Sequence, residues 1–242
     1  MKKIILTFLV PFAFFACADD SQQMIVEGNI EGLKKGTVFL QRYDEGKLVN
    51  LDSMVAKGEG KFRFVTPLES PEIFYIYLDL NKQEGTDFGD RLLFFGEPTK
   101  ITIESTHKMF DINAKVSGSE SQKILEQYNK MMRKFGTRNM ELLEQQINAV
   151  KEGQSQKVDS LKELSEKNTL RKYLFSVNYA MNHSNSYVAP YIALTDIFDA
   201  NVKYLDSVYN KLSPEVAKSK YGKELQVHIE EVKKAQAKND NP

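Results

Sequence analysis

The sequence predicts an α+β protein, with an N-terminal antiparallel β-sandwich followed by a C-terminal all-helical domain. From residue 24 to residue 117, apolar side chains mostly recur at every second position, and turn signals separate the runs, as in all-β sandwiches. From residue 118 onward the apolar spacing changes to three and four, which is the period of helices that bury one face. We therefore expect a β-sandwich domain over residues 24–117, a helical domain over 118–237 and a frayed tail over 238–242.

Residues 1–16 have the features of a secretory signal peptide. Lys2 and Lys3 precede an apolar run from Ile4 to Ala16. A membrane-spanning helix needs roughly 20 apolar residues, so this run is too short to span a bilayer.

Cys17 is the only cysteine, and it directly follows the apolar run. A small residue such as Ala16 before a cysteine at this place resembles the site at which bacterial lipoproteins are cleaved and lipidated. We expect a lipid anchor on Cys17, with residues 17–23 as a tether and the membrane as a partner. The expected location is the bacterial cell envelope, at the outer membrane on its periplasmic or surface face. A secreted protein with an unused cysteine is the alternative.

The β half contains eight candidate strands. Phe62 and Phe64 alternate with polar residues, as in a half-buried strand, whereas Phe74–Leu80 is nearly all apolar and predicts a central strand covered on both faces. The candidate strands are Met24–Ile30, Thr37–Tyr43, Leu48–Ala56, Lys61–Thr66, Ile73–Leu80, Arg91–Phe95, Lys100–Glu104 and Phe110–Val116.

The helical half begins with a capping signal. Ser119 and Gln122 have the spacing of a capping box, and an apolar stripe then continues past a weak point at Gly136 until Gly153. Ser213 before Pro214 predicts another helix start. The further helices are expected at residues 155–167, 169–182, 187–199, 201–212 and 220–237.

Composition excludes several classes of function. The 33 basic and 33 acidic residues balance, so nothing favours nucleic acid as a partner. One cysteine excludes intramolecular disulfides and Cys-x-x-Cys chemistry, and His107, His183 and His228 lack metal-ligand spacing. No phosphate-binding loop or nucleophile elbow is present. We therefore expect no catalytic residue, no cofactor and no metal, and the histidines to serve packing and capping.

Several segments resemble one protein family. They are Ile25–Ile30, Val38–Gln41, Lys57–Phe64, Lys115–Ser119, Asn182–Ala189 and Leu212–Pro214. Together they resemble the N-terminal domain of unknown function, with its helical extension, of bacterial lipoproteins that end in a thioredoxin-like thiol–disulfide oxidoreductase domain. In those relatives the thioredoxin fold carries a catalytic Cys-x-x-Cys. This sequence has no such motif. The resemblance therefore implies the fold and the envelope location of those relatives, but not their redox activity.

Two groups of residues are candidates for a ligand surface. Tyr75, Tyr77 and Asp79 fall on one face of their strand, where an aromatic strip stacks on a sugar ring or is covered by the helical half. Residues 79–90, which include Asp87 and Asp90, echo a calcium-binding loop, although the glycine and the last acidic residue are misplaced for one. A loop between two strands is the simpler interpretation of that segment.

These observations predict a lipid-anchored envelope protein that acts as a non-catalytic binding or assembly module. It would present its β loops or the cleft between the halves to an envelope protein or a small ligand. One alternative is an accessory, or split half, of a thiol–disulfide oxidoreductase system that works with a separate thioredoxin-like protein. Another is a surface glycan-binding lipoprotein.

Overall fold

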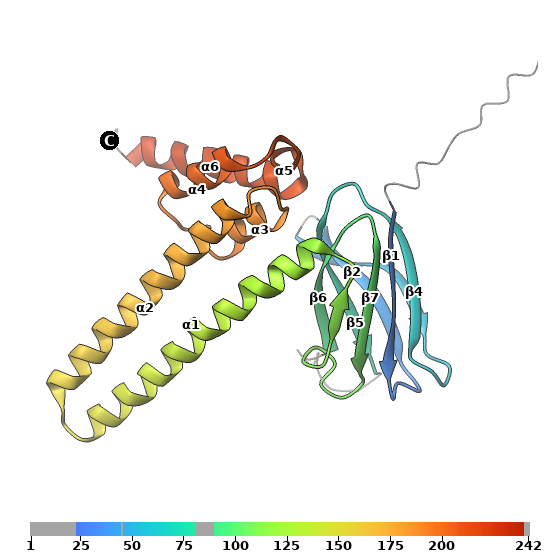
Figure 1. Cartoon of the computed structure of the whole chain (residues 1–242), viewed down its shortest axis with the longest axis horizontal. Coiled ribbons are helices and arrows are strands. Elements are labelled where there is room, and N and C mark those ends of the chain that lie inside the picture. The colour runs from blue at the N-terminus through green and yellow to red at the C-terminus, as the bar shows by residue number, and fades with distance from the viewer. Residues whose placement is uncertain (1–22, 45, 81–89, 240–242) are drawn as a thin grey trace, which may run out of the picture.

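In the part of the chain that the structure describes, eight strands are followed by six helices, as in an α+β protein with a β-sandwich-like first part and a helical second part (Figure 1). The computed structural model describes residues 23–44, 46–80 and 90–239. Its strands are β1 (Gln23–Glu31), β2 (Thr37–Asp44), β3 (Lys47–Val55), β4 (Lys61–Pro67), β5 (Glu72–Asp79), β6 (Arg91–Gly96), β7 (Lys100–Thr106) and β8 (Lys115–Ser117).

The strands form two four-stranded sheets, with the orders β4-β1-β7-β8 and β3-β2-β5-β6. Neighbouring strands run antiparallel in every described pair except β1 and β7, which are parallel. A parallel pair needs a crossover connection, and here the chain passes through the second sheet between β1 and β7. The predicted antiparallel sandwich is thus confirmed apart from this pair.

The core between the sheets follows the predicted alternation. Phe62 and Phe64 are buried, at 5% and 1% exposure, while their polar neighbours face outward. β5 is internal in its sheet, and its residues Phe74, Ile76 and Leu78 are fully buried between the sheets. On its other face, Ile73 and Tyr75 pack against the helices, whereas Tyr77 and Asp79 do not belong to that core. The prediction of a central strand covered on both faces is therefore confirmed for the first half of β5 only.

The last predicted strand is wrong at its start. Residues 110–113 form turns, and only Lys115–Ser117 pairs with β7. Met109 has a positive φ of 54°, and its carbonyl accepts a hydrogen bond from the Asn113 amide. Phe110 is buried because it closes the end of the sandwich core from a loop, and an apolar residue of that kind imitates a strand position in the sequence.

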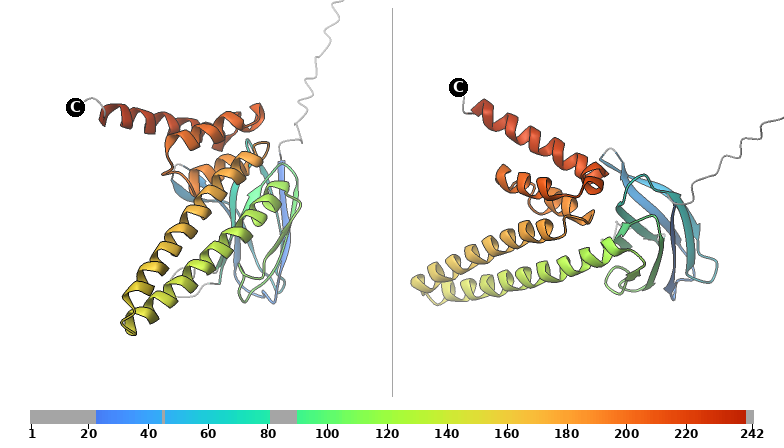
Figure 2. Two further views of the ribbon diagram at one scale, coloured as in Figure 1. Left: turned by 60° about the vertical axis from the view of Figure 1, so that its left-hand side comes forward. Right: turned by 45° about the horizontal axis from the view of Figure 1, so that its top comes forward.

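The helices divide into a long hairpin and a compact group. They are α1 (Glu120–Lys151), α2 (Ser155–Asn182), α3 (Val188–Thr195), α4 (Val202–Lys211), α5 (Pro214–Lys218) and α6 (Lys220–Asn239). α1 and α2 lie antiparallel and extend away from the sandwich, whereas α3 to α6 gather beside it (Figures 1 and 2). We call residues 136–170 of this hairpin the helical arm.

The largest departures from the predicted helix bounds are in α2 and α3. A single helix α2 replaces the two that were predicted to meet at residue 168. The side chain of Asn168 donates to the Phe135 carbonyl at 3.0 Å and to Asn139 Oδ1 at 2.7 Å, so this polar residue joins α1 to α2 without interrupting the helix. α3 ends at Thr195, four residues before its predicted end, and residues 196–200 form turns.

α1 is attached to the sandwich at its first turn. Ser119 caps the helix by accepting from the Gln122 amide at 3.0 Å, as predicted. The side chain of Gln122 accepts instead from the backbone amide of Phe95, on the edge strand β6, at 2.8 Å. Glu97 accepts from the amides of Glu120 and Ser121, so a strand turn supplies a second cap for α1.

Candidate functional site

The two halves meet on the outer face of the β3-β2-β5-β6 sheet. Ile73 of β5 and Phe95 of β6 belong to the helical core, together with residues of α1, α3 and α6. Tyr221 of α6 accepts a hydrogen bond from the Ile73 amide at 3.0 Å through its hydroxyl. This contact places the start of α6 beside the start of β5, and two adjoining cavities open there.

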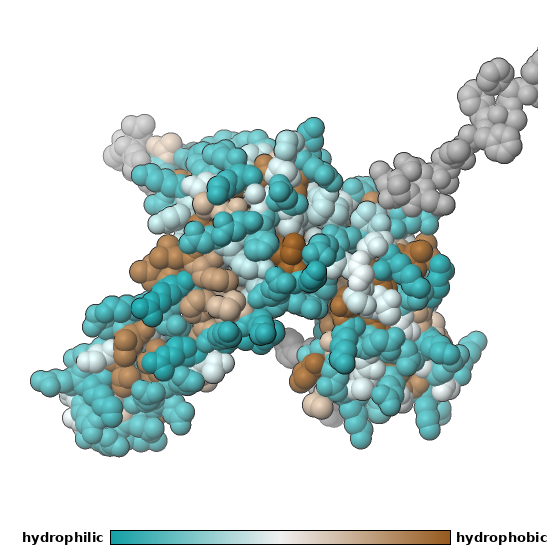
Figure 3. All heavy atoms as spheres, viewed as in Figure 1, coloured by the Kyte–Doolittle hydropathy of each residue, from teal (hydrophilic) through white to brown (hydrophobic). Residues whose placement is uncertain are grey.

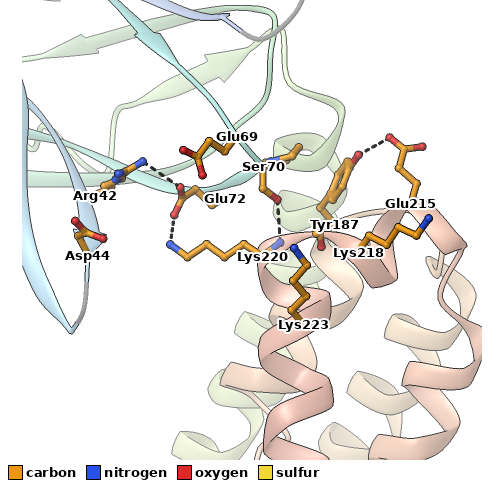
Figure 4. Close-up of a pocket in the computed structure, with 12 residues that line it drawn as sticks. Arg42, Asp44, Glu69, Ser70, Glu72, Tyr187, Glu215, Lys218, Lys220 and Lys223 are labelled. Carbon is orange, nitrogen blue, oxygen red and sulfur yellow. Dashed lines mark hydrogen bonds and ion pairs between the residues drawn. The ribbon is translucent and has the colours of Figure 1, made fainter.

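The first cavity, the junction cleft, has a volume of about 500 Å³. The end of β2, the connection from β4 to β5, and the helices α5 and α6 contribute its walls (Figure 4). Its charged lining residues are Arg42, Asp44, Glu69, Glu72, Glu215, Lys218, Lys220 and Lys223. The four basic and four acidic side chains balance, so the cleft is strongly polar without a net charge.

Glu72 is the centre of the junction cleft. Its side chain is only 7% exposed and lies between Arg42, at 3.6 Å, and the ammonium of Lys220, which donates to the other carboxylate oxygen (Figure 4). A buried carboxylate is tolerated when cations and hydrogen bonds replace its water. The Lys220 amide also donates to Ser70 Oγ at 3.0 Å. Glu72 and Ser70 therefore fasten α6 to the sandwich.

The second cavity, the aromatic pocket, adjoins the cleft and shares Glu72 and Lys220 with it. Its volume is about 370 Å³. Four tyrosines from four different elements line it, together with Thr195 and Glu224, namely Tyr43 of β2, Tyr75 of β5, Tyr191 of α3 and Tyr221 of α6. Cavities of this size between two domains, with apolar walls and a few polar groups, are the usual form of small-molecule sites.

The rings of the aromatic pocket stand at an angle to one another. Tyr43 and Tyr75 pack edge to face, with centroids 5.9 Å apart and an interplanar angle of 74°. Tyr191 and Tyr221 have centroids 5.4 Å apart and an angle of 48°. Phe95 packs edge-on against both of the latter rings. The helical core thus fixes two of the four rings.

Burial raises the pKa of three tyrosines of the pocket. It raises the pKa of Tyr191 to about 12, with smaller contributions from Tyr75 and Asp196. Burial also raises the pKa of Tyr221 and that of Tyr75 above their ordinary value. These tyrosines are therefore neutral hydrogen-bonding groups at physiological pH.

The structure separates the two tyrosines that the strand pattern placed together. Tyr75 lies in the aromatic pocket, against the helical half. Tyr77 stacks on Phe39, with centroids 5.8 Å apart, and lies under the guanidinium of Arg91 at 4.7 Å. The guanidinium Nε of Arg91 donates to Gln41 at 3.1 Å. Tyr77 thus belongs to a cluster on the open part of the sheet face.

The remaining predicted site residues lie elsewhere. Asp79 ends β5 and Asp90 directly precedes β6, and both are partly buried. Asp87 and Cys17 lie outside the described residues. Within the described ranges, no group of three histidine, cysteine or acidic residues is placed to hold a metal ion.

The three histidines each contact a backbone carbonyl. His107 Nδ1 lies 3.3 Å from the Glu31 oxygen, His183 Nδ1 lies 2.9 Å from that of Tyr179, and His228 Nε2 lies 2.7 Å from that of Phe198. His183 caps the end of α2 and stacks on Tyr179. Among helices whose placement is described, none is long and apolar enough to cross a membrane.

Most residues of both cavities have no signal in the sequence that marks them as parts of one site. Glu72 and Lys220 are 148 positions apart, and Tyr75 and Tyr191 lie in different halves. One local signal was present, because Glu72 is a charged residue that opens an otherwise apolar strand. A charge in that position needs a partner, but the sequence does not say which of many lysines supplies it.

A third, larger groove of about 1010 Å³ runs between α1 and β6. Its cations are Arg91, Lys123, Lys130 and Arg133, opposed by Asp111 and Glu126. Lys130 and Arg133 are exposed on α1, and the groove has no convergent aromatic side chains. The junction cleft and the aromatic pocket are therefore the better defined site.

Comparison with known proteins gives one match. Searches of curated proteins and of solved structures found no match. A family model matches the sandwich and the first turns of α1. That family model is described as Domain of unknown function (DUF4369), and it matches residues 24–125 of the chain.

Proposed function

We propose that the protein is a lipid-anchored bacterial cell-envelope protein that acts as a non-catalytic binding or assembly module. The proposed location is supported by the short apolar run from Ile4 to Ala16 and by Cys17 directly after it. Two or more acyl chains give stable membrane anchoring, whereas one gives only marginal binding. A lipidated Cys17 therefore leaves the folded halves at a membrane surface.

The observation that carries the binding role is the pair of cavities at the junction of the two halves. Each cavity takes walls from both the sandwich and the helices, so the site exists only in the folded, docked molecule. The buried carboxylate of Glu72 is engaged by Arg42 and Lys220. A carboxylate held by two cations is suited to fixing the shape of a site.

The helical arm supports the assembly role. Met140, Leu143, Ile147 and Val150 form one stripe on α1, and their exposed fractions range from 47% to 66%. Figure 3 shows apolar side chains on the otherwise polar surface of the arm. Contiguous exposed apolar surface of this kind marks interaction sites.

The resemblance to thioredoxin-associated lipoproteins supports a narrower version of the proposal. In that version the module works beside a separately encoded thioredoxin-like protein, which supplies the reactive thiols. The prediction is that such a protein co-purifies with this one.

The proposal is tested by affinity purification of the tagged full chain from its native envelope after chemical crosslinking. The wild type is compared with Lys223→Glu in the junction cleft and with Lys203→Glu, an exposed lysine of α4 outside both cavities. We expect Lys223→Glu to capture at least 80% less of a specific envelope partner, and Lys203→Glu to capture as much as the wild type. A loss of roughly 1.4 kcal/mol in the free energy of binding lowers the affinity tenfold, which is enough for this effect.

Two further measurements address the anchor and the absence of catalysis. Cys17→Ser is expected to move the protein from the membrane fraction to the soluble envelope fraction. Turnover of a disulfide substrate by the wild type at a rate above that of Cys17→Ser would overturn the non-catalytic role.

A further inference from the structure

The aromatic pocket has the features of a site for a small, rigid ligand with one apolar face. Four tyrosine rings from β2, β5, α3 and α6 line a single cavity of about 370 Å³. Tyr191 and Tyr221 are held by the edge of Phe95, and the hydroxyl of Tyr221 accepts from the Ile73 amide at 3.0 Å. These rings are therefore in place before any ligand arrives, which reduces the entropy lost on binding.

One ring at the mouth of the pocket is accessible. Tyr43 is 52% exposed and packs edge to face on Tyr75. A ring in that position has an open face and does not complete the helical core, to which Tyr75, Tyr191 and Tyr221 belong. The exposure of the Tyr43 ring has a function if that ring packs against a bound ligand.

The charges in the pocket favour a neutral ligand. The carboxylate of Glu72 is already balanced by Lys220 and Arg42. The ammonium of Lys220 also lines the pocket, and it disfavours an organic cation, which tyrosine rings otherwise attract. Glu224, opposite in sign to Lys220, disfavours an anion.

The polar groups suit a ligand that carries several hydroxyls. The hydroxyl of Tyr221 uses its oxygen as the acceptor for Ile73 and keeps its own hydrogen for donation. Glu224 accepts hydrogen bonds and Lys220 donates them, so both kinds of partner are present in one cavity. A purely apolar ligand would leave these groups unsatisfied, at an energetic penalty.

We propose that the aromatic pocket binds the pyranose ring of a sugar, with the C–H face of the ring against the tyrosines and its hydroxyls on Glu224, Lys220 and Tyr221. Such a ring is apolar on its faces and polar around its edge, and the pocket offers aromatic rings for the faces and polar groups for the hydroxyls. This inference rests on the proposed binding function and names the chemical class of the ligand.

Saturation-transfer difference NMR on the full chain in detergent micelles tests the proposal. The probes are the methyl pyranosides of glucose, galactose and mannose, and N-acetylglucosamine. Transfer to the ring protons of at least one sugar is expected for the wild type. Tyr43→Ala removes an exposed ring and is expected to weaken that binding at least tenfold. Tyr204→Ala removes a similarly exposed tyrosine of α4, outside the pocket, and is expected to change it less than twofold.

Glu224→Gln keeps the shape of the side chain and removes its charge, and is expected to weaken sugar binding while leaving the folded spectrum unchanged. Tetramethylammonium serves as the probe for a cation. The proposal is overturned if no sugar shows transfer, if Tyr43→Ala and Tyr204→Ala bind equally well, or if tetramethylammonium binds and the sugars do not. In each of these cases, the proposed binding function is still supported if Lys223→Glu reduces the capture of an envelope partner.

Discussion

At the scale of single residues, Glu72 joins the two halves through ion pairs with both of them. It opens β5 at 5% exposure, yet its partners come from β2 and from the first turn of α6. A carboxylate in this place makes the docking of α6 specific, because an apolar residue there would leave Arg42 and Lys220 without a counter-charge.

Replacing Glu72 by glutamine should lower the free energy of unfolding by about 2 kcal/mol. Loss of one partner from a buried ion pair typically costs 3–5 kcal/mol, and the value here is smaller because Arg42 and Lys220 are about one-third exposed. Urea unfolding followed by circular dichroism measures the change. Glu120→Gln is the control, since its pair with Lys123 is exposed and contributes about 0.5 kcal/mol or less. Equal effects of the two substitutions would contradict this account.

At the scale of elements, α1 is a continuous helix that tolerates a glycine within it. The modest helix propensity of Gly136 left a weak point in the sequence pattern, but the helix passes through it without a break. A methyl group added at Gly136 meets nothing within 4 Å, whereas one added at Gly222 in α6 lies 2.2 Å from the Val216 carbonyl oxygen. The same residue type therefore has opposite roles in the two helices.

Gly136→Ala should raise the free energy of unfolding by about 0.5–1 kcal/mol, because alanine lowers the entropy of the unfolded chain and fits the helix. Gly222→Ala should lower it by at least about 1–3 kcal/mol, as overpacked sites do. Thermal and urea unfolding of the two variants measure both signs. Destabilisation by Gly136→Ala would show that the added methyl group does contact other atoms of the protein.

The attachment of α1 to the edge of β6 depends on one side chain. Gln122→Ala would leave the buried amide of Phe95 without its acceptor, and such a group costs about 1–3 kcal/mol. Hydrogen exchange should show faster exchange of the Phe95 amide, together with lower stability. Gln127→Ala, on an exposed position of the same helix, should change neither. An unchanged Phe95 exchange rate in Gln122→Ala would mean that another group protects this amide.

At the scale of the whole molecule, the apolar core of the helical half extends onto the sandwich, whose two sheets enclose a separate core of their own. Ile73 and Phe95 lie on strands but pack in the helical cluster, at 5% and 0% exposure. Because neither half covers these residues alone, the two halves should unfold in a single cooperative transition.

That transition should become easier between about pH 10 and pH 12. Burial, with lesser effects from neighbouring acids and tyrosines, raises the pKa of both Tyr187 and Tyr191 from 10.0 to about 12. In this range the folded protein keeps phenolic protons that the unfolded chain has lost. Stability is therefore full below pH 10 and falls as the pH rises.

Urea midpoints at pH 8, 10 and 11, with tyrosinate absorbance, measure this dependence, because these pH values lie below, at and above the ordinary pKa of tyrosine. Tyr191→Phe removes one of the titrating groups and should flatten the decline. A midpoint that stays constant from pH 8 to pH 11 would contradict the expected loss of stability.

The sequence predicted most of the fold because its signals are local. Alternation such as that of Phe62 and Phe64 and the capping signal at Ser119 concern neighbouring residues, and both are confirmed. The candidate site was predicted only through Tyr75. Its other walls are brought together by tertiary docking across the junction, and a balanced composition holds many residues that are equally able to pair.

Asn168 and Phe110 show how local signals also mislead. A polar residue within a helical pattern suggested a break, but its hydrogen bonds to α1 make it an interior link. An apolar residue before β8 suggested a strand, but it fills the core from a turn. In both cases a partner distant in sequence decided the outcome.

The position of β1 determines how the molecule bears a pull on its N-terminal end. β1 lies between β4 and β7, with seven aligned residue pairs on each side, and the chain enters it at Gln23. Tension along the strand axis acts on both ladders in shear, so their hydrogen bonds are strained together and do not open one after another. If the protein is tethered through this strand, the fold should resist a larger force than it would if the tether were attached to a strand at the edge of a sheet.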